Sequence, residues 1–131
     1  MSLESALALI ESVREYRVLF VGDSITDEYH YVHPLGKSPK ENLIPVQYLK
    51  SEVFQGGVVA AANHVRTLCA KVDLCASPTA VRKARYVDRT YLRKLFEVHY
   101  DEVQALNSYM DGQYDVVVVT DFGHKRISGD M

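Results

Sequence analysis

The segment RVLFVGDSITDEY, residues 17–29, decides the fold class because a short apolar run passes directly into a polar turn. The run Arg17–Val21 is nearly continuous and ends at Gly22, which is typical of a strand buried on both faces of a sheet. A second such run, Val116–Val119, precedes another polar turn near the end of the sequence. Since helical patterns lie between these runs, the sequence predicts an α/β fold with a parallel sheet and flanking helices.

The rest of the chain divides into helical and β-rich stretches. Apolar spacing predicts helices over residues 2–13, 58–68 and 101–110, the first with Ser2 as its cap. The β-rich segments are Tyr29–Val32, Leu43–Leu49 and Val81–Val87, and they are punctuated by prolines. These segments predict a smaller sheet attached to the main one, within a single domain spanning residues 1–131.

Composition excludes several functional classes. The 131 residues carry a formal net charge of −2, so no broad basic surface is expected and no nucleic-acid partner is predicted. No apolar run is long enough to cross a membrane and no secretory signal is evident, so we expect a cytoplasmic protein without a membrane partner. Cys69 and Cys75 fit neither a disulfide framework nor a zinc pattern, so reduced thiols and no metal site are predicted.

Polar residues follow both predicted core strands. In an open α/β sheet, ligands collect at the carboxyl ends of the strands, which makes Asp23, Asp27 and Asp121 candidate binding residues. Asp23 and Asp27 are four residues apart, and paired carboxylates suit the vicinal hydroxyls of a sugar. The pair Gly56-Gly57 precedes a predicted helix, where backbone N–H groups can approach a ligand closely.

The order of five sequence blocks resembles the ribokinase-like (phosphofructokinase-B family) carbohydrate kinases. The blocks are VLFVGDSITDEY (18–29), GKSPKENLIPV (36–46), FQGGVVAAANHV (54–65), PTAVRKARYVDRTYLRKLFEV (78–98) and YDVVVVTDFGH (114–124). The resemblance is strongest to heptose-type kinases, which are often fused to a nucleotidyltransferase. It implies a partial ribokinase-like parallel sheet with a small β lid, formed by residues of about 28–54 and 78–98.

This resemblance assigns roles to particular residues. It implies that Asp27 binds sugar hydroxyls, that Gly56 and Gly57 line the same pocket, and that Lys37 enters near the substrate. Asn63 is the nearest match to an asparagine that many family members carry after the glycine pair. The basic segment 78–89 would either meet a phosphate on the sugar or form a solvated strand face. The lid implies a homodimer, or pairing with a complementary carboxyl-terminal half.

Two departures from the family pattern limit the activity that we expect of this chain. A helix and a strand that normally follow the position of Cys75 are missing. The family's ATP and Mg²⁺ segments, N-x-x-E and G-x-G-D, which also supply the catalytic base, are not found in these 131 residues. Phosphoryl transfer depends on positioning and charge stabilisation, so we expect this chain to phosphorylate a sugar only if that half is supplied.

Two alternatives stay open at the level of sequence. The block GDSIT also resembles the first motif of GDSL (SGNH) esterases, with Ser24 as nucleophile, His124 as base and Asp121 as its orienting partner. The G-x-N-D block of that family is not found. The other alternative is a non-catalytic kinase relic that binds a sugar or dimerises through its lid.

Overall fold

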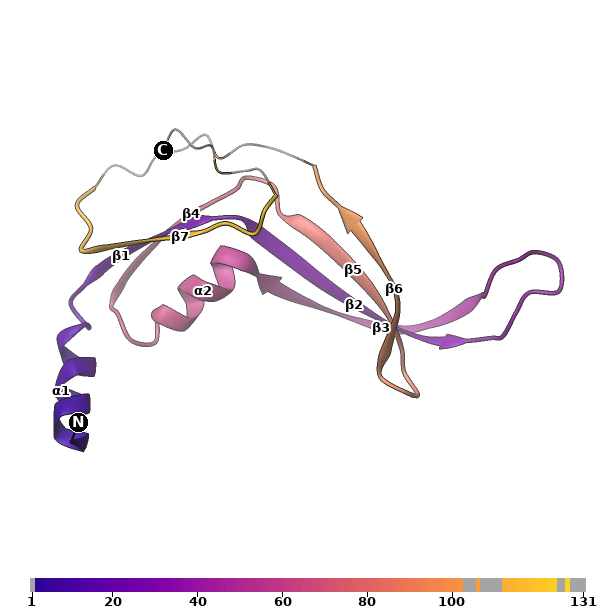
Figure 1. The fold of residues 1–131 in the computed structure, drawn as a ribbon, viewed down its shortest axis with the longest axis horizontal. Helices are drawn as coiled ribbons and strands as arrows, with labels where there is room; N and C mark the ends of the chain where they lie inside the picture. Colours follow the sequence, from indigo (N-terminus) through magenta and orange to yellow (C-terminus); the bar gives the residue numbers. More distant parts are fainter. Residues whose placement is uncertain (1, 103–105, 107–111, 125–126, 128–131) are drawn as a thin grey trace. The chain divides into compact units, whose positions relative to one another are not determined.

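The computed structural model describes residues 2–102, 106, 112–124 and 127 (Figure 1). Its elements in chain order are α1 (Leu3–Ser12), β1 (Arg17–Gly22), β2 (Ser24–Pro34), β3 (Val46–Gly56), α2 (Gly57–Val65), β4 (Lys71–Ala76), β5 (Val81–Asp88), β6 (Arg93–Tyr100) and β7 (Val116–Thr120). They form two compact units. The parallel-sheet unit comprises the described parts of Met1–Ile25, Gln55–Ala80 and Glu102–Met131, and the β-rich unit comprises Thr26–Phe54 and Val81–Asp101.

The parallel-sheet unit is built around β1. Its strand order is β4-β1-β7, and β1 runs parallel to both neighbours, with Val18 opposite Val72 on one side and Val116 on the other. Helix α2 packs on this sheet, and its Val58 and Ala62 join Val18 and other side chains in a buried apolar core. The predicted α/β class, with a parallel sheet and flanking helices, is therefore confirmed.

Helix α1 forms where the sequence predicted it but does not join this core. The Ser2 hydroxyl accepts the Ser5 N–H at 3.1 Å and so caps the first turn. None of its residues is buried, and Leu3 and Leu7 are 76% and 53% exposed. The apolar spacing of residues 2–13 thus predicted the helix correctly. In the structure, however, the apolar side chains of this helix are not buried.

Several boundaries differ from the sequence prediction. Strand β4 was not predicted, because Asp73 interrupts its apolar pattern, yet it pairs with β1 along its full length. Helix α2 ends at Val65 rather than Leu68, where turn hydrogen bonds replace the helical ladder. Most of the predicted helix 101–110 lies outside the described residues. Within the described residues, no helix is long and apolar enough to cross a membrane.

The β-rich unit contains the predicted smaller sheet, with strand order β3-β2-β5-β6. Strands β5 and β6 form an antiparallel pair with a register shift at Tyr86/Val87. Three rings from three strands stack across one face, with centroids 4.9 Å apart for His30 and Tyr86 and 4.5 Å apart for Tyr86 and Phe96. Its buried hydrophobic side chains are few: Val32, Val81, Ala84 and Val87.

Candidate functional site

A small hollow in the β-rich unit combines two carboxylates with three aromatic rings. It is lined by Asp27, Tyr29 and Tyr31 of β2 and by Glu52 and Phe54 of β3, and its volume is about 230 Å³. Alternate residues of a strand point to the same face, so the spacing 27, 29, 31 places the three β2 side chains together. Glu52 and Phe54 follow the same alternation on the adjacent strand.

Asp27 is held by an arginine that serves two carboxylates. The Arg85 guanidinium donates a short hydrogen bond to Asp27 Oδ1, and its Nε lies 2.6 Å from Glu97 Oε2. Burial works against the charge of Arg85, but the hydrogen bond with Asp27 and the nearby acids outweigh it and raise its pKa. Arg85 therefore orients Asp27 while leaving Oδ2 without a hydrogen-bond partner among the described residues.

The second carboxylate is held by a tyrosine and a lysine. Glu52 accepts hydrogen bonds from Lys50 Nζ at 2.6 Å and from the Tyr31 hydroxyl at 3.0 Å. The bond from Lys50, followed by that from Tyr31, lowers the pKa of Glu52. Donation to Glu52 in turn raises the pKa of Tyr31. At neutral pH the hollow thus presents a charged carboxylate beside a protonated phenol.

The aromatic rings give the hollow an apolar side. Tyr29 and Phe54 meet edge to face, with centroids 5.8 Å apart and planes at 79°. The Arg85 guanidinium lies 5.2 Å from the centroid of the Tyr29 ring, which fixes that ring further. Rings and carboxylates together complement a molecule with C–H groups and hydroxyls, which is the chemistry of a sugar.

In the parallel-sheet unit, Asp23 follows the carboxyl end of β1 and is fully buried. Its Oδ2 accepts the Phe122 N–H at 3.3 Å, which ties the segment after β7 to the segment after β1. Its Oδ1 is buried and has no hydrogen-bond partner among the described residues. Asp23 therefore has a clear structural role, and its carboxylate is not accessible to a ligand in this structure.

The glycine pair allows a close backbone approach at the same place. Gly57 has a φ of +59°, and a Cβ built there would lie 2.2 Å from the Asp23 carbonyl oxygen. That carbonyl accepts the Val58 N–H at 2.9 Å, at the start of α2. Gly56 is in an extended conformation before the helix. The requirement for glycine at position 57 is thus explained by sterics within the chain.

The remaining predicted ligands are distributed among different sites. Asp121 is exposed, and its Oδ1 accepts the Gly123 N–H at 2.8 Å in a local turn. Asn63 is exposed on α2, and its Oδ1 accepts a hydrogen bond from Arg66 at 2.6 Å. Lys37 lies in the β-rich unit but lines a larger hollow that shares no residue with the one around Asp27. Asp27 and Lys37 therefore do not line a common pocket.

The Ser24 hydroxyl is buried and forms hydrogen bonds with Ser77. Ser24 is 7% exposed, and its Oγ lies 3.2 Å from the Ser77 carbonyl oxygen and 3.1 Å from the Ser77 hydroxyl. A serine nucleophile needs a hydrogen bond to a base and access to its substrate. The geometry at Ser24 shows a buried structural pair, which does not favour the esterase alternative.

Two arginines of the basic segment after Pro78, Arg82 and Arg85, are paired with acidic side chains within the β-rich unit. Arg82 lies 3.2 Å from Glu28 and stacks 3.8 Å from the Tyr100 ring centroid. Arg85 is engaged by Asp27 and Glu97. These two guanidinium groups support a paired strand face more than a phosphate site.

The main site residues that sequence reasoning missed are Tyr29, Tyr31, Glu52 and Phe54. The alternation 27, 29, 31 was a usable signal, but the register that places β3 beside β2 is not readable from either strand alone. Among the described residues, no group of three or more His, Cys, Asp and Glu side chains is arranged to hold a metal ion.

The solved structures to which part of this chain is similar include two carbohydrate kinases. One is the ribokinase of Thermotoga maritima, at a TM-score of 0.37 and 16% identity over 66% of this chain and 36% of that one. Another is a carbohydrate kinase from Agrobacterium tumefaciens, at a TM-score of 0.35 and 10% identity over 65% of this chain and 35% of that one. The chain thus spans about a third of the length of these structures. No protein-family model and no curated protein matches it.

Proposed function

We propose that this chain is the sugar-binding portion of a ribokinase-type carbohydrate kinase and that it binds sugar hydroxyls in the hollow around Asp27. The observation that carries the proposal is the pairing of the Asp27 and Glu52 carboxylates with aromatic rings in one small hollow. The ordered sequence blocks and the α/β fold are consistent with it. The substrate-binding roles that the resemblance implies for Gly56, Gly57 and Asp121 stay proposals.

The charge of the two carboxylates indicates which end of a sugar this hollow would accept. A phosphate group beside two carboxylates would be repelled, and the nearest cations, Arg85 and Lys50, are already paired. A neutral, hydroxyl-bearing end suits both the acceptors and the rings. We therefore favour a heptose or hexose whose unphosphorylated end enters the hollow, with any phosphate directed away from it.

The chain's own contribution is binding and orientation. Asp27 would accept hydrogen bonds from hydroxyls, and Arg85 would hold its carboxylate in place. ATP and Mg²⁺, which the resemblance implies, supply the phosphoryl group and neutralise its charge when bound. Among the described residues, no group of three or more His, Cys, Asp and Glu side chains is arranged to hold a metal ion. No step of this proposal is therefore assigned to ATP or Mg²⁺.

We further propose that the β-rich unit forms a homodimer. Its outer strands β3 and β6 leave large apolar side chains exposed, and unpaired strand edges favour association. The exposed side chains on these strands that line neither of the hollows are Tyr48, Leu49, Val53 and Tyr100. Sedimentation velocity should show concentration-dependent association that Val53→Glu weakens, and a strictly monomeric profile at high concentration would contradict it.

Calorimetry with heptoses and hexoses, each with and without phosphate, tests the sugar proposal. Asp27→Asn keeps the shape of the side chain but removes its charge, and it should weaken binding at least tenfold. Glu52→Gln should weaken binding less, because both Glu52 oxygens already accept hydrogen bonds from Lys50 and Tyr31. Glu11→Gln on α1 is the matched control, since Glu11 is exposed and makes only a surface ion pair with Arg14. Equal binding by Asp27→Asn and the natural chain would refute the assignment.

A further inference from the structure

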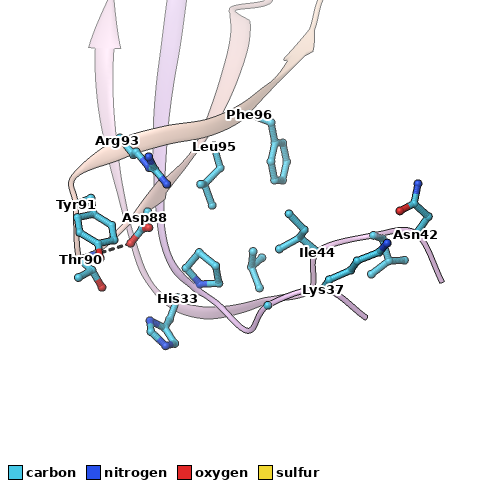
Figure 2. A pocket seen from close by; sticks show the side chains of 14 residues that line it. His33, Lys37, Asn42, Ile44, Asp88, Thr90, Tyr91, Arg93, Leu95 and Phe96 are labelled. Atoms are coloured by element: carbon cyan, nitrogen blue, oxygen red, sulfur yellow. Dashed lines mark hydrogen bonds between the residues drawn. The ribbon is translucent and has the colours of Figure 1, made fainter. Parts of the chain in front are cut away.

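A second, larger hollow lies at one end of the β-rich unit (Figure 2). Its lining residues lie within 33–46, the β2–β3 connection with the adjoining strand ends, and within 88–96, the β5–β6 connection with the end of β5 and the start of β6. Its volume is about 950 Å³, near the upper end of the range typical of small-molecule sites. It shares no lining residue with the hollow around Asp27 and is not used by the proposed function.

The middle of this hollow is apolar and only partly shielded. Leu95 and Phe96 project from β6 toward Ile44 of the connecting segment, as Figure 2 shows. Ile44 is 65% exposed and Phe96 is 49% exposed, so a ligand could remove a substantial apolar area from water. The Phe96 ring also stacks on Tyr86, with centroids 4.5 Å apart, which holds it in place before any ligand arrives.

The charged groups around this apolar centre are mainly cationic. The cations Lys37 and Arg93 line the hollow, whereas Asp88 is the one acidic side chain among its lining residues. Asp88 is buried, and its Oδ1 accepts the Thr90 N–H at 2.8 Å. In Figure 2, Arg93 lies at the same end as Asp88.

Lys37 lies at the other end of the hollow, near Asn42 (Figure 2). Neither side chain forms an ion pair or a hydrogen bond with the described residues. An ammonium group and an amide with free donors complement an anionic oxygen group. The hollow thus places an anion-binding end beside an apolar surface.

We propose that this hollow binds a small amphipathic anion. A ring or short acyl chain lies against Ile44, Leu95 and Phe96, and a carboxylate or phosphate group contacts Lys37 and Asn42. The proposal goes beyond sugar binding and assigns Lys37 to this second site. Both parts of the ligand are needed, because the apolar surface provides area and the lysine provides charge complementarity.

Calorimetry on the full chain with four probes tests both parts of the ligand. 1-Naphthyl phosphate and 1-naphthoate carry ring and charge, 1-naphthol carries the ring alone, and inorganic phosphate carries the charge alone. We expect saturable binding of at least one naphthyl anion, with the preferred anion identifying the head group. 1-Naphthol should bind at least tenfold more weakly, and inorganic phosphate should give no measurable heat. Equal affinity for 1-naphthol and both anions, or no saturable binding of either anion, would overturn the proposal.

Variants then locate the site. Lys37→Ala should weaken the preferred anion at least tenfold, whereas Lys40→Ala, in the same segment but outside the lining, should not. Ile44→Ser should also weaken it, and the high exposure of Ile44 means that folding is not at stake. Asp27→Asn should leave this binding unchanged, which separates the result from the sugar proposal. Unchanged affinity in Lys37→Ala would overturn the assignment.

A second copy of the chain is the competing occupant. If a copy filled the hollow, affinity for the naphthyl anion would fall as protein concentration rises, because ligand and copy would compete. We expect affinity to be independent of protein concentration. A marked decrease, together with dimer dissociation by the anion in sedimentation, would contradict the small-molecule assignment.

Discussion

The two units of this chain are stabilised by different interactions. In the parallel-sheet unit, apolar side chains such as Phe20 and Val58 are almost completely buried between a helix and three strands. In the β-rich unit, much of the order comes from ion pairs around Arg85 and from stacked rings around Tyr86, all partly exposed. The comparison shows that the unit with the weaker core presents the richer set of polar and aromatic groups to a ligand.

The largest difference should appear when one phenylalanine is removed from each unit. Phe20→Ala removes a side chain that is 3% exposed, and we expect it to destabilise the fold by about 3–5 kcal/mol. Phe96→Ala removes a half-exposed ring and mainly its stacking on Tyr86, with an expected loss of about 1 kcal/mol. Urea unfolding followed by circular dichroism measures both, and equal losses would contradict the contrast between the units.

Alanine substitutions at two glycines distinguish the cost of a steric clash from the cost of a positive φ. Gly57 and Gly36 both have positive φ, but a Cβ at Gly57 meets the Asp23 carbonyl, whereas one at Gly36 meets nothing within 4 Å. Gly36→Ala should cost about 1 kcal/mol from conformation alone. Gly57→Ala should cost about 2–3 kcal/mol because the clash adds to that. Similar melting temperatures for the two variants would show that the close approach at Gly57 is not needed.

Substitution of two arginines compares the stability that a partly buried, shared ion pair contributes with that of an exposed ion pair. Arg85→Met leaves the partly buried carboxylates of Asp27 and Glu97 without their common donor, and we expect a loss of about 1–2 kcal/mol. Arg14→Met breaks an exposed pair with Glu11 at 3.7 Å and should cost less than about 0.5 kcal/mol. Thermal unfolding at low ionic strength measures both variants. A larger effect at Arg14 would refute the role given to Arg85.

The smallest effect should be the acid dependence of the Glu52 contacts. Because its folded pKa is lowered, Glu52 stabilises the folded state fully above the ordinary glutamate pKa of about 4.3. This contribution is lost as the pH falls through the lower folded value. The stability difference between the natural chain and Glu52→Gln should therefore shrink on acidification from pH 6 to below pH 4. A difference that is constant over this interval would contradict the lowered pKa.

Sequence reasoning reached the core strands and the presence of a second sheet, because continuous apolar runs such as Arg17–Val21 and Val116–Val119 are typical of parallel strands. The burial expected for the second run was wrong, since Val116, Val117 and Val119 are exposed. It missed β4, whose Asp73 disguises a paired strand. It also singled out Asp27 but not Glu52, because the partner of a strand residue depends on register between segments about 20 residues apart. Lys37 was placed with the sugar ligands, although its structural neighbours form a separate hollow.

The arginines of the basic segment show a similar limit. A run of charges in sequence does not state which acids lie opposite it, so Arg82 and Arg85 were open to a phosphate interpretation. The structure pairs them with Glu28, Asp27 and Glu97. Pairing across strands is a tertiary property, and it decides whether a cation is available to a ligand.

The most direct test of the account is a sugar titration followed by backbone amide chemical shifts in two-dimensional NMR spectra. The heptoses and hexoses used in calorimetry serve as ligands, and the Asp27→Asn variant serves as the control. We predict saturable shifts concentrated at residues 27–31 and 52–54, and their loss in the variant. Saturable binding that leaves both segments unshifted, or no binding of any sugar in the panel, would contradict the proposal that the Asp27 hollow is the sugar site.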